Sequence, residues 1–385
     1  PMTPLHNTRI LDLTRLLPGA VCTLLLRDLG AEIIKVEDPQ TGDYARLMPP
    51  LIDGMGAFFQ ASSRGKKSIA INLKSTAGQA VLHRLISSAD VLIEGFRPGV
   101  TVRLGADYET LSAVNPRLVY CSLSGWGQTG PYAHLSGHDL NYIARNGLLG
   151  ADLAPATPGA QAADVSGAYV AVMGILAALL QRQQTGEGDC LDVALSEAAM
   201  PLALAAWVEA QTTPPNDGFI SLRGESASYR VYSCADGEPV ALGAVEAKFW
   251  ANFCRAVEQP EWIAQQFDRR RQPALIDEVA ALFKSKTADD WSAVLAGADC
   301  CFSRVIAPDQ LLDDPQIAAR GMVGLDERGV PWMRSPIRLR GDATTRQPAP
   351  APAHGEHTIE SLREIGYSPA DIERLLADNV IRQAP

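Results

Sequence analysis

The alternation of short apolar strands with helices over the first 125 residues is the feature that most constrains the fold of this chain. Residues 8–14 (TRILDLT) and 31–37 (AEIIKVE) are typical strands. Between them, Pro18 suits the start of a helix and Gly30 suits its end. The pattern recurs with strands expected at 67–74, 90–96 and 117–125, and helices at 78–89 and 108–114. We therefore predict an α/β fold with a Rossmann-like large domain, whose parallel sheet is covered by helices.

The length of 385 residues exceeds that of most single cores and favours two domains. The turn-forming segment 212–218 (TTPPNDG) resembles a linker, and beyond it we expect a hairpin followed by several helices. We also expect a long apolar helix at 165–184, a strand at 190–195 and a helix at 197–210. We predict a large domain at 1–215, a small α+β domain at 216–330, and a return segment with C-terminal helices at 331–385 that completes the large domain.

Composition narrows the possible partners. The formal net charge of −10 argues against nucleic acid or an anionic membrane, because either would repel the chain. Glycines interrupt the apolar segment 165–184, which favours a buried helix over a membrane span. Seven cysteines without metal-ligand or disulfide-framework spacing, and no secretory signal, indicate reduced thiols in a cytoplasmic protein. Neither a GxGxxG fingerprint nor a P-loop is present.

His138 and Asp164 are the strongest candidates for chemistry. His138 lies in SGHDLNY, where a structural interpretation makes it an exposed loop residue and Asp139 the cap of a helix beginning at Leu140. Asp164 directly precedes an apolar helix and suits the N-cap position. A carboxylate there is also held ionised by the helix amides, and an oriented carboxylate can act as a base or a nucleophile.

Glu246 and a set of basic residues are weaker candidates. Glu246 stands where a strand ends and a helix begins, so it also suits a first-turn acid. Basic residues follow several strands of the expected sheet, where ligands of such folds bind, and Arg and Lys suit phosphates. Solvated surface charge is an equally good interpretation of each one alone. The positions that we assign to coenzyme A binding are Arg46, Arg64, Lys66, Lys67, Leu73, Lys74, Arg97 and Arg103.

A resemblance to a known family covers nearly the whole chain. The segments that carry it are residues 10–37, RGKKSIAINLK at 64–74, VLIEGFRPGV at 91–100, LSGWGQTGPYAHLSGHDLNY at 123–142, TGEGDCLDVAL at 185–195, ADGEPVALGAVEAKFW at 235–250 and DPQIAARGMV at 314–323. In this order, from about residue 8 to residue 377, the sequence resembles the class III CoA-transferase family, which includes the carnitine CoA-transferases and the bile-acid-inducible F proteins. The resemblance implies an interlocked homodimer, an acyl-CoA substrate that brings its own coenzyme A, and no other cofactor or metal.

The family contains two chemistries. By resemblance, Asp164 matches the transferase aspartate, which forms an acyl anhydride and then an aspartyl-CoA thioester. The α-methylacyl-CoA racemases keep this aspartate and add a histidine in GHDxNY and a glutamate in GAxExxF, which match His138 and Glu246. Here DVSGAY replaces the racemase DFGGG after Asp164.

Three functions therefore stay open. The first is an acyl-CoA racemase or epimerase in which His138 and Asp164 move a proton at the α-carbon, Glu246 orients His138, and amides near Asp164 and in the glycine loops stabilise the enolate. The second is a CoA-transferase that uses Asp164 as the nucleophile. The third is a binding protein without catalysis, which requires all three residues to be structural.

Overall fold

The chain forms two compact units. The computed structural model describes residues 3–150, 158–212, 222, 224–339 and 349–384. One unit comprises residues 1–203 and 315–385, and the other comprises residues 204–314. The sequence-based boundaries at 215 and 330 lie later than these, and most of the linker expected at 212–218 falls outside the described residues.

The helix expected at 197–210 is interrupted, and the first boundary lies at that interruption. In its place are α8 (Leu195–Ala198), a 3-10 turn at Met200–Ala203, and α9 (Leu204–Thr212), which begins the second unit. Pro201 lacks the amide hydrogen that would continue an α-helical ladder, which explains the break.

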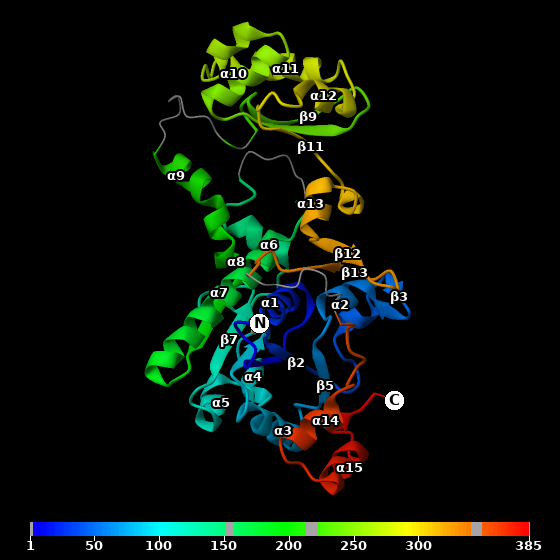
Figure 1. Ribbon diagram of the computed structural model, residues 1–385. Helices are drawn as coiled ribbons and strands as arrows, with labels where there is room; N and C mark the ends of the chain where they lie inside the picture. Colours follow the sequence, from blue (N-terminus) through cyan, green and yellow to red (C-terminus); the bar gives the residue numbers. More distant parts are fainter. Residues whose placement is uncertain (1–2, 151–157, 213–221, 223, 340–348, 385) are drawn as a thin grey trace. The chain divides into compact units, whose positions relative to one another are not determined.

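A seven-stranded sheet organises the first unit (Figure 1). Its order is β14-β5-β2-β1-β6-β7-β8. The strands are β1 (Arg9–Asp12), β2 (Glu32–Glu37), β5 (Lys67–Ile71), β6 (Val91–Glu94), β7 (Val119–Ser124), β8 (Cys190–Ala194) and β14 (Ile381–Arg382). All neighbouring pairs are parallel except β14, which runs antiparallel to β5 at the edge. The predicted Rossmann-like α/β fold is confirmed.

Strand order reverses between β1 and β6. Leu11 of β1 pairs with Ile34 of β2 on one side and with Leu92 of β6 on the other. After β1 the chain continues towards β2 and β5, whereas after β6 it continues towards β7 and β8. The loops that leave β1 and β6 therefore diverge, and in sheets of this type such a switch point is where ligands bind.

Alternate side chains of each strand enter two cores. Ile10, Ile33 and Val91 pack on one face with α1 (Leu16–Asp28), α6 (Asp139–Arg145) and α7 (Ala162–Thr185). Leu11, Ile34 and Leu92 pack on the opposite face, which is covered by α3 (Thr76–Ile86), α5 (Tyr108–Val114), α14 (Thr358–Glu364) and α15 (Pro369–Ala377). This alternation is the period of two that a strand imposes on its side chains.

Helix α7 is long and apolar enough to cross a membrane by length and composition. One face of it, including Ala168, Ala171 and Ile175, is fully buried in the first core. The helix predicted from the sequence at 165–184 is confirmed as α7, but only one face of it is buried, because Met173 and Leu180 are exposed. The first turn of α7 lies at the switch-point end of the sheet, where Asp164 lines the cleft described below.

Shorter elements complete the first unit. They are the 3-10 helix η1 (Tyr44–Leu47), β3 (Leu51–Ile52), β4 (Met55–Gly56), α2 (Ala57–Ser62), α4 (Val100–Arg103), α13 (Pro315–Arg320), β12 (Val323–Leu325) and β13 (Pro331–Met333).

The second unit is an α+β structure with an aromatic core. Its antiparallel sheet has the order β11-β10-β9. The elements after α9 are β9 (Tyr229–Ser233), β10 (Pro239–Gly243), α10 (Ala247–Ala256), η3 (Pro260–Gln265), α11 (Gln272–Phe283), α12 (Ala288–Leu295), β11 (Phe302–Arg304) and η4 (Pro308–Gln310). The Phe283 ring lies 5.1 Å from that of Tyr232 and 5.3 Å from that of Trp291, centroid to centroid. The predicted hairpin is confirmed as β9 and β10.

Candidate active site

A cleft of about 530 Å³ lies at the switch point of the large sheet. The loops that follow β1, β6 and β7 line it with residues 13–16, 95–98 and 124–126. Both His138 and Asp164 line the same cleft, although they are 26 positions apart in the sequence. The structure therefore brings together the two residues that the sequence singles out for chemistry.

His138 stands at the N-cap of α6 with an exposed side chain. Its backbone N–H donates to Asn141 Oδ1 at 3.0 Å, and its carbonyl oxygen accepts from Asn141 N at 2.8 Å. These two bonds fix the backbone of His138 while the imidazole lines the cleft. The asparagine of the SGHDLNY segment thus holds the histidine in place.

Asp164 is the third residue of α7 and is partly buried. Burial and the nearby Asp139 carboxylate raise the pKa of Asp164 to about 6, while His138 opposes this rise. The sequence-based placement of Asp164 at the N-cap is therefore wrong, and its pKa is raised rather than lowered. The helix begins at Ala162, ahead of Asp164, and loss of solvation with a like charge outweighs the helix amides.

The sequence suggests that Asp139 caps the helix that follows it, but in the structure Asp139 does not cap its own helix. It is the first residue of α6 and is buried. Its Oδ1 accepts the Ala163 N–H at 2.6 Å and the Asp164 N–H at 3.0 Å. The carboxylate next to His138 in the sequence therefore caps the helix that carries Asp164.

Aromatic packing supports the histidine segment. The Tyr142 hydroxyl donates to the Gly137 carbonyl oxygen at 2.7 Å, and the Tyr142 and Trp126 rings meet edge-to-face at 4.9 Å. A Cβ atom at Gly125 would lie 2.2 Å from the Tyr142 hydroxyl, so only glycine allows this approach. Close packing of Tyr142 thus explains the first glycine of the SGWG segment, whereas Gly127 has a positive φ of 84°.

Glu246 belongs to the second unit. It occupies the N-cap of α10 with an exposed side chain, which makes no capping hydrogen bond. The orientation of His138 by Glu246 stays a prediction.

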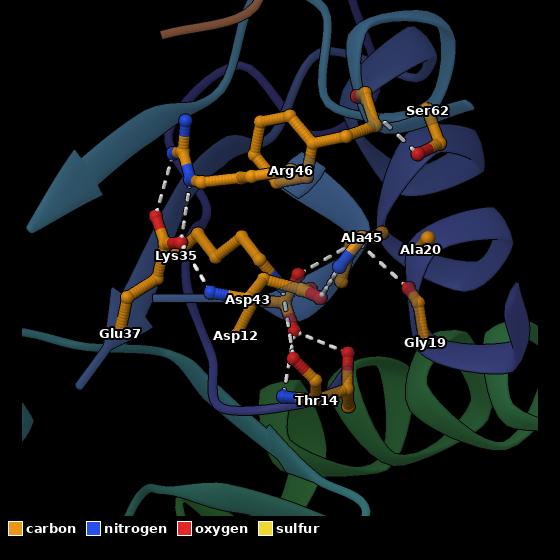
Figure 2. A network of polar contacts seen from close by, with 12 residues as sticks. Asp12, Thr14, Gly19, Ala20, Lys35, Glu37, Asp43, Ala45, Arg46 and Ser62 are labelled. Carbon is orange, nitrogen blue, oxygen red and sulfur yellow. Dashed lines mark hydrogen bonds and ion pairs between the residues drawn. The ribbon is translucent and has the colours of Figure 1, made fainter. Parts of the chain in front are cut away.

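The structure places Arg46 in a buried ion pair. Figure 2 shows its guanidinium against the Glu37 carboxylate, with contacts of 2.7 Å and 2.8 Å. The guanidinium also lies 4.0 Å from the centre of the Phe59 ring. Burial opposes ionisation of Glu37, but the bonds from Arg46 outweigh it and lower the Glu37 pKa to about 2. Because the Glu37 carboxylate already pairs with the Arg46 guanidinium, the charge of Arg46 needs no bound phosphate as a partner.

Lys66 lies in a neighbouring buried polar network. Its ammonium donates to Thr23 Oγ1 at 2.7 Å and lies 3.8 Å from Asp12, while burial lowers its pKa to about 8. Asp12 accepts from the Thr14 backbone and hydroxyl, and Lys35 donates to the Thr14 carbonyl (Figure 2). Because Thr14 lines the cleft, this network supports the cleft from beneath.

Arg64 and Lys67 are also held in ion pairs. Arg64 is buried and binds both oxygens of Asp28 at 2.8 Å. Lys67 is partly exposed and lies 3.0 Å from Glu32 and 3.2 Å from Glu360. Neither residue is among those that line the cleft.

Arg97 is the residue of the proposed coenzyme A set that lines the cleft, and it is exposed. Leu73 packs against the second core, while Lys74 and Arg103 are exposed and lie outside the cleft lining. Sequence analysis missed Arg15, which is exposed and lines the cleft directly after β1. The signal was available, because Arg15 follows a strand just as Arg97 does.

Among the described residues, no group of three or more His, Cys, Asp or Glu side chains is arranged to hold a metal ion. The cleft thus contains an imidazole and a carboxyl group together with two exposed guanidinium groups.

Comparison with known proteins gives a consistent picture. The sequence model of CoA-transferase family III matches residues 5–358. The α-methylacyl-CoA racemase of Mus musculus is 32% identical, over 98% of this chain and 97% of the relative. The succinyl-CoA:glutarate CoA-transferase of the same organism is 31% identical, over 99% of this chain and 91% of the relative. A crystal structure of a CAIB/BAIF family protein from Brucella suis superposes with a TM-score of 0.81 at 30% identity, covering 95% of this chain and all of that one.

Proposed function

Since the chain belongs to CoA-transferase family III, we propose that it is an acyl-CoA racemase or epimerase that inverts the α-carbon of a 2-methylacyl-CoA. The observation that carries the proposal is His138 in the same cleft as Asp164, because a transferase route needs the carboxylate alone. The racemase among the relatives supports the same choice.

The protonation of Asp164 suits this reaction. Inversion requires one group to remove the α-proton from one face and another to return a proton to the opposite face. Burial and the Asp139 charge raise the Asp164 pKa to about 6, so this carboxyl group can take up and release a proton near neutral pH. A group that does both can serve as the acid in one direction of the reaction and as the base in the other.

In one direction, neutral His138 removes the proton and protonated Asp164 delivers its own to the enolate. In the other direction, the Asp164 carboxylate is the base and the His138 imidazolium is the acid. Two amides near Asp164 that were candidates for the enolate oxygen, those of Ala163 and Asp164, donate to Asp139 instead. Stabilisation of the enolate therefore falls to the glycine loops that line the cleft, at Gly95, Gly125 and Gly137.

Coenzyme A would bind through the exposed guanidinium groups at the mouth of the cleft. Arg15 and Arg97 follow adjacent strands at the switch point and both line the cleft, so we assign the phosphates of coenzyme A to them. The buried cations Arg46, Arg64 and Lys66 then act on the substrate only by supporting these loops. We further propose a cytoplasmic homodimer, with Glu246 orienting His138.

A CoA-transferase is the second candidate, favoured by the transferase among the relatives. In that reaction Asp164 attacks the thioester carbonyl, coenzyme A leaves as a thiolate, and the acyl group remains on the carboxylate as an anhydride. The thiolate then attacks this anhydride, giving the aspartyl-CoA thioester and a free acid. His138 has no required role in these steps.

The experiment that separates the two is incubation of one enantiomer of a 2-methylacyl-CoA without any acid acceptor, followed by chiral analysis. We expect the wild-type protein to form the other enantiomer and His138→Gln to form none. Hydroxylamine-trappable acyl or CoA adducts at Asp164, with transfer to added carboxylates unaffected by His138→Gln, would favour the transferase.

A further inference from the structure

We infer that Asp139 is a positioning residue that links the two reactive groups of the cleft: its carboxylate caps the helix that carries Asp164 and presents a negative charge to the Asp164 carboxyl. The inference rests on the acid–base function proposed above, and it adds a residue that does not touch substrate.

The Asp139 side chain joins the first turns of α6 and α7. His138 and Asp139 are consecutive residues at the start of α6, and Asp139 Oδ1 accepts from both Ala163 and Asp164 at the start of α7. The first turns of the two helices are therefore tied together by one side chain. A change in the position of α6 moves His138 and, through Asp139, the backbone of Asp164.

Capping alone does not require a charge at position 139. An asparagine could accept the same two N–H groups through its Oδ1 without the desolvation penalty of a buried carboxylate. Asp139 is only 8% exposed, so a charge here is costly unless it is compensated. The two amides and the N-terminus of α7 supply that compensation. Since an asparagine could make the same two hydrogen bonds, we assign the charge of Asp139 a further role, which is its effect on Asp164.

Several charged and polar groups surround Asp164. Asp139, His138 and Tyr142 act on it from α6 and its N-cap, and Arg97, from the loop after β6, acts on Tyr142. Burial is the largest cause of the raised Asp164 pKa, and Asp139 is the second. Asp139 thus helps to retain a proton on Asp164 at pH values where an ordinary aspartate has lost it.

Asp139→Asn tests the charge while keeping an acceptor for the two amides. The midpoint of Asp164 is followed by carbon-13 NMR of labelled aspartate carboxyls, with the signal assigned by its loss in Asp164→Asn. We expect a wild-type midpoint of about 6 and a fall of about one pH unit in Asp139→Asn. The lower limb of the pH profile of kcat/KM should move in the same direction.

Asp107→Asn is the matched control. Asp107 also caps a helix, accepting from the Thr110 N–H at 3.0 Å at the start of α5, and it does not line the cleft. The same substitution there should leave the Asp164 midpoint unchanged. An Asp164 midpoint that stays at the wild-type value in Asp139→Asn would overturn the inference, as would a wild-type midpoint near the ordinary 3.8.

Hydrogen exchange tests the capping part. Asp139→Ala should lose amide protection at Ala163 and Asp164, whereas Asp139→Asn should retain it. Equal protection in both variants would contradict the capping role. If Asp139→Asn fails to fold, Asp139→Ser is measured instead. The Asp164 midpoint of the wild-type protein still tests the inference in that case. The NMR readout needs no turnover, so a protein that does not interconvert enantiomers refutes the proposed function, whereas an unmoved titration refutes only the role of Asp139.

Discussion

The ionised form of Asp164, which the proposed reaction uses as a base, is disfavoured in the folded chain. Its folded-state pKa of about 6 lies above the ordinary 3.8, so the folded chain binds this proton more tightly than the unfolded chain. Stability from this group is therefore present below pH 3.8 and is lost as pH rises towards 6.

Asp164→Asn should accordingly raise the melting temperature at about pH 8, where the wild-type carboxylate is charged. The gain should shrink as pH falls and vanish below the ordinary pKa of 3.8. Scanning calorimetry across this range measures it. Glu109→Gln, in the first turn of α5, is the control, because Glu109 is exposed and lies outside the cleft. A melting temperature lowered at pH 8 by Asp164→Asn contradicts the account.

The coenzyme A site gives a second test at this scale. Arg97→Ala should raise KM for an acyl-CoA about tenfold with kcat little changed, because a charged contact to a distant phosphate acts on binding rather than on the reacting carbon. Steady-state kinetics measure the split. Arg84→Ala is the control, since Arg84 stacks on Tyr367 away from the cleft. A fall in kcat with unchanged KM would remove Arg97 from the phosphate site.

Residue roles differ in how far the sequence predicts them. His138 and Asp164 are recognisable from their motifs and helix boundaries. Asp139 is not, because its partners are amides 24 and 25 positions away that only the packing of α6 on α7 brings near. Arg46 and Lys66 lie in the sequence where phosphate-binding residues of such folds are expected. In the structure they instead form ion pairs with the buried carboxylates of Glu37 and Asp12.

Among elements, β2 departs most from its expected character. A strand covered on both faces is usually apolar, but Lys35 and Glu37 of β2 are buried. Lys35 pairs with Asp43 at 2.9 Å, and Glu37 pairs with Arg46 of η1. These pairs join β2 to η1, whose Tyr44 lines the cleft. The strand positions were predictable from the apolar runs, whereas this polar link was not.

Arg46→Met should therefore destabilise the fold by about 3–5 kcal/mol, because it leaves the Glu37 carboxylate buried without its partner. Urea denaturation at neutral pH measures the loss. Arg46→Met combined with Glu37→Leu should recover much of it, since no lone charge remains. Because the Glu37 pKa is lowered to about 2, its stabilising effect is complete above its ordinary 4.5 and disappears as pH falls towards 2. An Arg46→Met variant as stable as wild type would contradict this role.

For the whole molecule, the chain forms two compact units, and the homodimer stays a prediction. Helix α7 buries one face but exposes Tyr169, Met173 and Leu180, which recur at helical spacing along one stripe. Met173 is 61% exposed. An apolar stripe of this kind on the longest helix suits contact with a second copy.

Light scattering should accordingly give about twice the 41.2 kDa mass of the chain at every dilution. The double variant Met173→Glu and Leu180→Glu should shift this mass towards the monomer, because it buries charges in the contact. Val102→Glu, at an exposed apolar residue of α4, is the control and should leave the mass unchanged. A wild-type monomer at all dilutions would rule out the dimer.

The central claim is that His138 and Asp164 form an acid–base pair across an acyl-CoA α-carbon. The most direct measurement is uptake of deuterium at that carbon when a 2-methylacyl-CoA is incubated in heavy water with no second acid present. The account predicts uptake from either enantiomer by the wild-type protein. In His138→Gln it predicts no uptake from the enantiomer whose α-proton His138 removes, and no inversion of the other. Absence of uptake by the wild type, with transfer of coenzyme A to an added carboxylate that survives His138→Gln, would contradict it.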